Sequence, residues 1–241
     1  MEAMHEGDLC IRVWRASVRR LLPLIWGINA FLLVTNLALA AGWRPPVNTI
    51  AHQLNMDNEI CLAAWYASSL LLLVAGAAAL QAGLSGQVRG SARRSRPGWW
   101  MVTGIALFLS ADETATIHET IGNSYIKYVN ATFLGAHVTW TELLAPFILG
   151  AALFLGIFLW RELRSTPRAR AIFGVALGCW LGAVALETLA AVLGAMPVLG
   201  IFEPAVEETL ENVGTTLMLT ALLELGFRRS VKPLGQDRTA A

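Results

Sequence analysis

The segment SADETATIHETIG, residues 110–122, places four ionisable side chains directly after an uncharged apolar stretch, WWMVTGIALFL. These side chains are Asp112, Glu113, His118 and Glu119. Carboxylates and imidazoles bind hard or borderline divalent ions, and they also act as general acids and bases. Ionisable groups are costly inside a membrane and usually mark a functional site there. The segment therefore indicates acid–base or metal chemistry within an apolar layer.

Three further apolar segments also carry acids. Glu142 lies close to His137, and Glu187 is the lone acid of GAVALETLAAVLG. The third segment, which follows Pro204, contains Glu207, Glu208 and Glu211. On a helix, acids three or four residues apart are neighbours and can bracket a cation. Helix capping by Glu207 and Glu208, and a neutral, hydrogen-bonded Glu187, are the structural alternatives.

The spacing leads to one hypothesis for the site. Carboxylates from several helices would hold a divalent metal ion, and two further side chains would transfer protons. The predicted metal ligands are Asp112, Glu119, Glu142, Glu187, Glu208 and Glu211. The predicted catalytic residues are Glu113 and His118.

The composition predicts a membrane protein. Of the 241 residues, 56% are apolar and 15% are charged, whereas a typical soluble domain is about 25% charged. Six apolar segments approach or exceed the roughly 20 residues that a membrane-spanning helix needs. We therefore expect an all-α, polytopic bundle of six transmembrane helices that forms a single domain over residues 1–241. The expected spans are 21–41, 60–81, 99–121, 139–160, 171–196 and 205–227.

The basic residues predict the orientation of these spans. Sixteen of the 18 Lys and Arg residues lie in the two termini and in the second and fourth connections. Only Arg44 and Lys127 lie on the other side. Because basic residues are enriched on the cytoplasmic side, we expect both termini in the cytoplasm of a bacterial inner membrane. The tryptophans at span ends are typical of interfacial belts: Trp99, Trp100, Trp140 and Trp160.

This orientation brings the acids to one depth. At a rise of 1.5 Å per residue, Asp112 lies about 20 Å and Glu187 about 24 Å along spans that run outward. Glu142 of span four and the three acids at 207–211 of span six lie in the first turns of spans that run inward, whereas Glu224 is the exception near the cytoplasmic end. All of these acids except Glu224 therefore meet in the outer-leaflet half, where Arg44 and Lys127 are too few to neutralise them. Metal ions, protons or water must compensate the charge.

Helical periodicity refines this expectation for span 99–121. On one continuous helix, Asp112, Thr116 and Glu119 share a face, and His118 points roughly away from Glu119. In span 171–196, Gly174, Gly178 and Gly182 form a small-residue stripe that is typical of close helix packing.

Three stretches resemble a group of uncharacterised bacterial multi-span membrane proteins. They are LFLSADETATIHE, GAVALETLA and VEETLENVGTTLMLTALLE, within residues 99–225. That group carries a Ser-x-Asp-Glu…His-Glu element and a Glu-Glu-x-x-Glu-x-x-Gly element. The resemblance implies that the motif residues act as a set, and it implies no particular reaction. The matching residues are Ser110, Asp112, Glu113, His118, Glu119, Glu207, Glu208, Glu211 and Gly214.

Three functions fit this sequence, and they leave open whether the protein is an enzyme. The first is a hydrolase or oxidoreductase that uses Fe, Mn, Zn or Mg and acts on a lipid-like or small-molecule substrate. The second is a proton- or cation-coupled transporter or channel subunit, for which six spans favour a homo-oligomer. The third is a non-catalytic binding or scaffold protein. We expect membrane lipids as partners and no nucleic acid, because topology explains the arginines.

Overall fold

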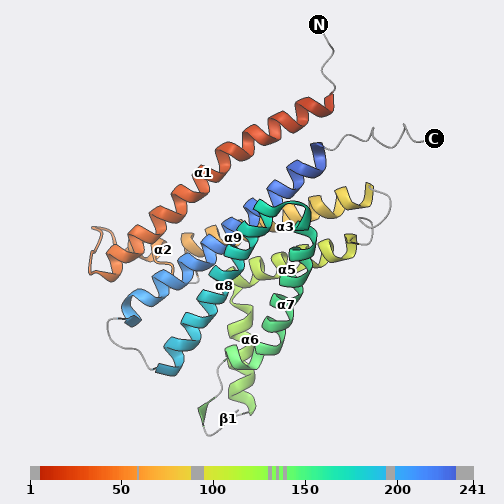
Figure 1. The fold of residues 1–241 in the computed structure, drawn as a ribbon. Coiled ribbons are helices and arrows are strands. Elements are labelled where there is room, and N and C mark those ends of the chain that lie inside the picture. Colours follow the sequence, from red (N-terminus) through yellow and green to blue (C-terminus); the bar gives the residue numbers. More distant parts are fainter. Residues whose placement is uncertain are drawn as a thin grey trace, which may run out of the picture.

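The computed structural model describes residues 6–58, 60–87, 95–129, 132–133, 136–137, 140–193 and 199–231. Within these residues the chain is almost entirely helical, which confirms the all-α class (Figure 1). The helices are α1 (Glu6–Ala40), α2 (Asn48–Leu54), α3 (Leu62–Gln87), α5 (Arg96–Ala115), α6 (Ile117–Val129), α7 (Trp140–Glu162), α8 (Pro167–Leu193) and α9 (Leu199–Val231). A short 3-10 turn, Leu163–Ser165, separates α7 from α8. The two-residue strands β1 (Thr132–Phe133) and β2 (Ala136–His137) pair in antiparallel fashion.

Four stretches of these helices are long and apolar enough to cross a membrane, and they identify a membrane protein. They are Arg20–Ala40, Leu62–Ser85, Leu143–Ser165 and Pro167–Leu186. The two remaining long helices that overlap predicted spans, α5 and α9, carry most of the acids of the motifs. The helix α2, in the connection between α1 and α3, was not predicted from the sequence.

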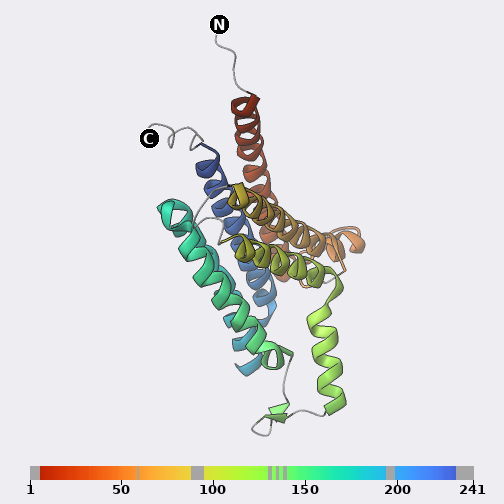
Figure 2. The same cartoon turned by 90° about the vertical axis from the view of Figure 1, so that its right-hand side faces the viewer.

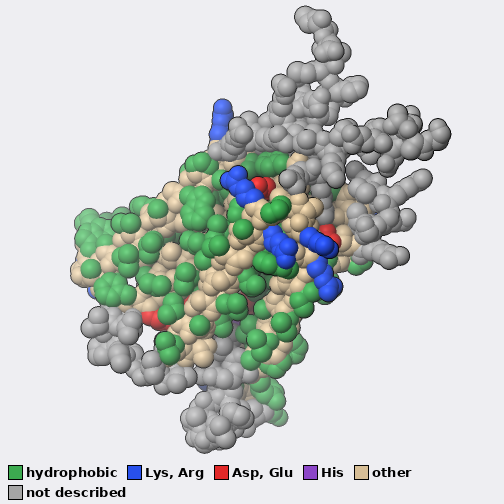
Figure 3. Space-filling model, in the orientation of Figure 1, with side chains coloured by type: hydrophobic (Ala, Val, Ile, Leu, Met, Phe, Trp, Pro, Cys, Tyr) green, Lys and Arg blue, Asp and Glu red, His purple; other side chains and the backbone are tan. Residues whose placement is uncertain are grey.

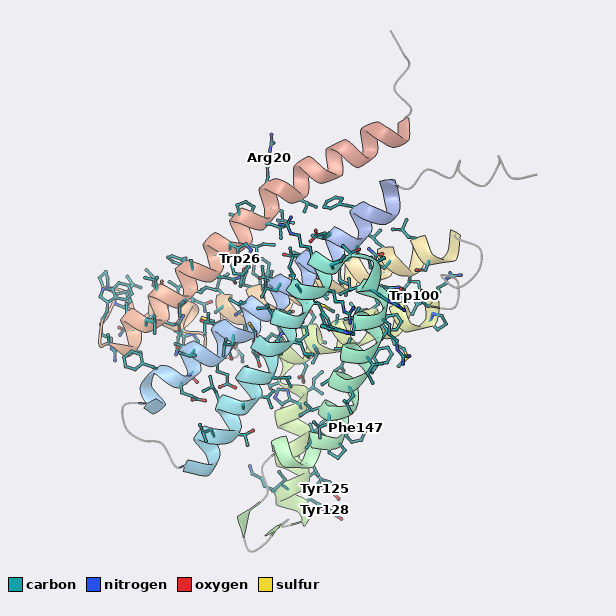
Figure 4. All side chains as sticks on the ribbon, viewed as in Figure 1. Arg20, Trp26, Trp100, Tyr125, Tyr128 and Phe147 are labelled. Atoms are coloured by element: carbon teal, nitrogen blue, oxygen red, sulfur yellow. The ribbon has the colours of Figure 1, made fainter. Side chains whose placement is uncertain are left out.

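The outer surface of the bundle is strongly apolar, as expected of a surface that contacts lipid. Large apolar side chains of α3 and α7 are exposed, and Phe147 is 76% exposed. Figure 3 shows hydrophobic side chains spread over the viewed face, and Figure 4 shows Phe147, Trp100, Tyr125 and Tyr128 on the outside. The remaining exposed apolar residues of α3 and α7 include Leu72, Leu73, Leu80, Leu149, Leu153 and Ile157.

The helix α9 is the centre of the packing. It contacts α1, α3 and α8, while α3 also packs extensively on α5. The apolar core includes four fully buried side chains from α5, α7, α8 and α9: Trp99, Leu159, Phe173 and Met218. Figure 2 shows α6 leaving this bundle at an angle to α5, beside α7.

Buried polar side chains link helices that are distant in the sequence. Asn29 of α1 donates to Thr216 Oγ1 of α9 (2.9 Å) and accepts from the hydroxyl of Tyr66 of α3 (2.8 Å). The hydroxyls of Ser68 on α3 and Ser110 on α5 lie 2.9 Å apart. Because lipid offers no competing hydrogen bonds, such pairs hold neighbouring helices in register.

The close helix contact lies on α9 rather than along the glycine stripe of α8. A Cβ atom on Gly178 would meet nothing within 4 Å, and one on Gly174 or Gly182 would make ordinary contacts at 3.5 Å. A Cβ atom on Gly214 would instead lie 2.8 Å from Cδ1 and Nε1 of Trp180. The prediction of close packing at the stripe was therefore wrong, because Gly214 of α9 is the residue that accommodates α8.

The tryptophans divide between core and surface. Trp100 and Trp160 are 50% and 45% exposed at neighbouring helix ends, as an interfacial belt requires. Trp99 does not belong to this belt, because it is fully buried and packs edge-on against Phe158. The side chain of Trp140 lies outside the described residues.

Candidate acidic site

A break in the predicted third span builds the first part of the site. The helix α5 ends at Ala115, and α6 begins at Ile117. Between them Thr116 adopts a left-handed conformation with φ 46° and ψ 42°, and its N–H donates to the carbonyl of Asp112 (2.7 Å). The prediction of one continuous helix over 99–121 was therefore wrong. The left-handed residue ends α5 and redirects the chain.

The break brings His118 back to Asp112. One carboxylate oxygen, Oδ1, accepts from the backbone N–H of His118 (2.8 Å), and Oδ2 lies 2.5 Å from Nδ1 of its imidazole. Asp112 is only 7% exposed. Helical periodicity did not place these two side chains together, because that geometry assumed an unbroken helix. The contact at Nδ1 fixes the orientation of the imidazole ring relative to the carboxylate.

Acids from separate elements converge beside this pair. The charge of Glu208 on α9 interacts with those of Glu207, Glu211, Glu113 on α5, and Asp57. Glu113 in turn interacts with Glu211 and with Asp112. We call these carboxylates, together with His118, the acidic site. Neighbouring like charges repel one another, so this arrangement destabilises the protein unless a cation or protons compensate the charge.

Asp57 is the member of the acidic site that sequence reasoning missed. It lies between α2 and α3, in the connection between the first two predicted spans. Asn36 of α1 holds this connection by accepting from the N–H of Met56 (2.9 Å) and donating to the carbonyl of Leu54 (2.9 Å). Asp57 could have been identified from the sequence by its position on the same predicted side of the membrane as the other acids.

Contacts with α8 fix the position of Glu211. The indole Nε1 of Trp180 lies 3.3 Å from both the Glu211 carbonyl and Thr215 Oγ1. Thr215 also donates to the Glu211 carbonyl (2.8 Å). The missing side chain at Gly214 allows this approach of the indole. The backbone carbonyl of Glu211 is therefore held by contacts both within α9 and with Trp180 of α8.

Three predicted ligands cannot be placed at the level of their side chains. Glu119 lies on α6, Glu142 in the first turn of α7 and Glu187 near the end of α8, and these side chains are outside the described part of the structure. The same holds for the side chain of His137 in β2. Among the side chains that are described, no group of three His, Cys, Asp or Glu could hold one metal ion. The six-ligand metal site remains a prediction.

The opposite end of the bundle carries basic residues. Trp99 Nε1 at the start of α5 donates to Glu162 Oε2 at the end of α7 (3.3 Å). Arg168 at the start of α8 lies 3.7 Å from Glu224 near the end of α9. These contacts place the start of α5, the α7–α8 turn and the end of α9 together, far along the helices from Glu113 and Glu208. We call this region the arginine end.

An apolar bundle with acids gathered at one end and arginines at the other defines a multi-span membrane protein with a polarised charge distribution. The chain belongs to the family described as "Domain of unknown function (DUF8692)", whose model matches residues 25–225. This range includes every residue of the acidic site. No curated protein and no solved structure matches the chain.

Proposed function

We propose that this chain is a six-span bacterial inner-membrane protein, with both termini in the cytoplasm, that binds a divalent cation at the acidic site. The single observation that carries the proposal is the mutual interaction of Glu113, Glu208 and Glu211, which come from two different helices. Arg44, a basic residue of this end, instead donates to the backbone carbonyls of Leu39 and Trp43. A bound cation would offset the repulsion that these carboxylates otherwise impose.

The chemistry of the donors suits hard or borderline ions such as Fe, Mn, Zn or Mg. Glu208 and Glu211 would hold the cation, with Glu119, Glu142 and Glu187 as further ligands. A bound divalent ion polarises a carbonyl or phosphoryl oxygen and makes bound water a better nucleophile. We assign Asp112 a positioning role in place of ligation, because both of its oxygens already contact His118.

Two side chains would transfer protons in this proposal. His118 is oriented by Asp112 through Nδ1, so its imidazole would take up and return a proton at a fixed place. Glu113 interacts with the charges of Asp112 and Glu211 and would provide a second proton acceptor. Together with a cation these groups support a hydrolase or an oxidoreductase.

The surroundings of the acidic site favour a lipid-like substrate. Leu107 and Phe108 of α5 are 47% and 55% exposed, and they lie just before Asp112 on the same helix. A lipid could therefore approach the site along an apolar surface, with its polar part meeting the carboxylates.

Metal analysis of the detergent-purified full-length protein tests the proposal. We expect stoichiometric divalent metal in the wild type, and a loss of at least tenfold in occupancy in Glu208→Gln, Glu211→Gln and Glu187→Ala. Glu224→Gln, at the arginine end, is the matched control and should retain the metal. Incubation with extracted membrane lipids, followed by mass spectrometry, would then reveal a hydrolysed or oxidised lipid. A wild-type protein without metal after purification in metal-supplemented buffer would refute the proposal.

Proton- or cation-coupled transport is the second candidate, and one observation favours it. Uncharged polar side chains continue from the acidic site toward the arginine end within the core: Ser110, Ser68, Thr103, Gln81 and Ser85 are all buried. Such groups could carry a hydrogen-bonded path across the bundle. Proton flux into reconstituted vesicles that disappears in Glu208→Gln, from a protein that holds no metal, would support transport over the enzyme.

A further inference from the structure

The α7–α8 turn concentrates positive charge outside the acidic site. Four arginines occur between residues 161 and 170, and three of them are exposed: Arg161, Arg164 and Arg168. Figure 3 shows Lys and Arg side chains gathered on the face that carries this turn. Two acids lie nearby: Glu162 accepts from the Trp99 indole, and Glu224 lies beside Arg168. The turn therefore keeps an excess of positive charge.

Aromatic residues place this turn at the level of lipid headgroups. Trp100 and Trp160 are half-exposed at the arginine end, as tryptophans at a membrane interface are. The guanidinium carbon of Arg170 lies 4.0 Å from the ring centroid of Trp160. Stacking on an indole holds the guanidinium flat and leaves its edge for hydrogen bonds to an anion.

Two buried polar atoms, one directly after the turn and one in the first turn of α8, lack hydrogen-bond partners within the described structure. They are Thr166 Oγ1 and Arg170 Nε, and Thr166 is only 3% exposed. Buried polar atoms are rarely left unpaired in folded proteins. Thr166 immediately precedes α8, a helix that spans Pro167–Leu193. The free N–H groups at the start of a helix favour an anionic ligand.

We propose that the α7–α8 turn binds the phosphate group of an anionic phospholipid. Arg164 and Arg168 would contact the phosphate oxygens, for which the guanidinium fork is well suited. The acyl chains would lie along Ile157 of α7 and Val175 of α8, which are 53% and 58% exposed. This apolar surface favours a lipid over a soluble phosphate. The proposal does not depend on the function of the acidic site.

Native mass spectrometry of the detergent-purified full-length protein tests the site. The protein is titrated with phosphatidylglycerol or phosphatidylcholine, and retained lipid is measured. We expect the wild type to prefer phosphatidylglycerol and Arg164→Gln/Arg168→Gln to lose about thirtyfold in its affinity, as for two basic residues near an anionic surface. The control Arg44→Gln/Lys127→Gln removes the same charge from the other end and should bind as the wild type does. Equal losses in both double variants, or no loss in either, would overturn the proposal.

Two further measurements distinguish a bound lipid from a soluble anion and test the hydroxyl contact. Displacement of phosphatidylglycerol by millimolar inorganic phosphate would assign the site to a soluble anion and overturn the lipid assignment. Thr166→Val removes a hydroxyl that makes no hydrogen bond within the described structure, so the variant should fold. We expect it to lose at least half of the phosphatidylglycerol-induced rise in Tm. An unchanged rise would contradict a hydroxyl contact with the ligand and with it the proposed site.

Discussion

Asp112 contacts His118 twice across the break between α5 and α6, at 2.8 Å through the backbone N–H and at 2.5 Å through the imidazole Nδ1. The same carboxylate therefore satisfies a free N–H at the start of α6 and orients the imidazole. It does so while nearly excluded from solvent. The pair joins two helices whose relative direction changes at Thr116, so the chemistry of His118 depends on the geometry of the break.

Replacing Asp112 by Asn should lower the free energy of unfolding by about 1.5–3 kcal/mol, the range for hydrogen bonds to charged groups. The amide oxygen can still accept from the His118 N–H, but the neutral amide no longer provides the charged acceptor that Nδ1–H contacts. Denaturant unfolding in detergent measures the change. Thr114→Ala, at an exposed position on the same helix end, is the control. Equal stability of Asp112→Asn and the wild type would show that the pair contributes little.

Two substitutions at Thr116 should have opposite outcomes. Its φ of 46° is readily adopted by Gly and is unavailable to Pro. Thr116→Gly should keep the break and stay within about 1 kcal/mol of the wild type. Thr116→Pro also removes the N–H that donates to Asp112 and should cost about 3 kcal/mol or more. Thermal unfolding compares the two, and a tolerated proline would contradict the left-handed conformation.

Gly214 and Gly178 should respond differently to alanine. A Cβ atom on Gly214 would lie 2.8 Å from the Trp180 indole and 3.1 Å from the Ala176 carbonyl oxygen. Gly214→Ala should therefore cost about 1–3 kcal/mol, as overpacking does. Gly178→Ala meets no atom within 4 Å and should be neutral or stabilising by up to about 1 kcal/mol. If Gly178→Ala proved the more damaging of the two in thermal unfolding, the close approach of α8 to α9 at Gly214 would be incorrect.

The repulsion within the acidic site predicts that the effect of Glu208→Gln on the Tm depends on whether a divalent cation is present. Glu208 interacts unfavourably with Glu211, Glu113, Glu207 and Asp57. In chelator, Glu208→Gln should raise the Tm, because it removes one of these like charges. In millimolar Mn²⁺ or Zn²⁺ the wild type should gain the larger rise in Tm, because it keeps a ligand that the variant lacks. Glu224→Gln should show neither effect, and a cation response of the same size in all three proteins would indicate non-specific binding.

Cysteine labelling tests the orientation of the bundle. In a background without Cys10, Cys61 and Cys179, Thr49→Cys in α2 should react with an impermeant maleimide in intact spheroplasts. Arg164→Cys in the α7–α8 turn should react only after the membrane is opened. The reverse pattern would place the acidic site on the cytoplasmic side, and reaction of both before opening would exclude the six-span arrangement.

The helices were predictable because long apolar segments leave few alternatives to a helix in a membrane. The described ends of α7, Trp140 and Glu162, fall within two residues of the predicted 139–160. The ends of α1 and α9 were less predictable. The helix α1 begins at Glu6 rather than at residue 21, and α9 begins at Leu199, before Pro204. Proline is tolerated inside these helices, so it did not mark a boundary.

The acidic site was predictable in outline, and its geometry was not. The rise per residue predicts a common depth for the acids, and the charges of Glu113 on α5 and Glu211 on α9 interact in the structure. The pairing of Asp112 with His118 depends on a left-handed threonine, and threonine gives no sequence signal for this conformation. The contribution of Asp57 depends on how a connection folds over the bundle, which periodicity does not describe.

The hydrogen bond from Asn29 to Thr216 joins the first long helix of the chain to the last. The two residues are 187 positions apart in the sequence. At a synthesis rate of about 5–20 residues per second, the ribosome therefore adds Thr216 roughly 10–40 s after Asn29. During that interval α1 resides in the bilayer without α9, the helix with which it has its most extensive contact. Assembly of the bundle is therefore completed from its C-terminal end, and chains truncated before α9 should be recognised as unfinished by membrane quality control.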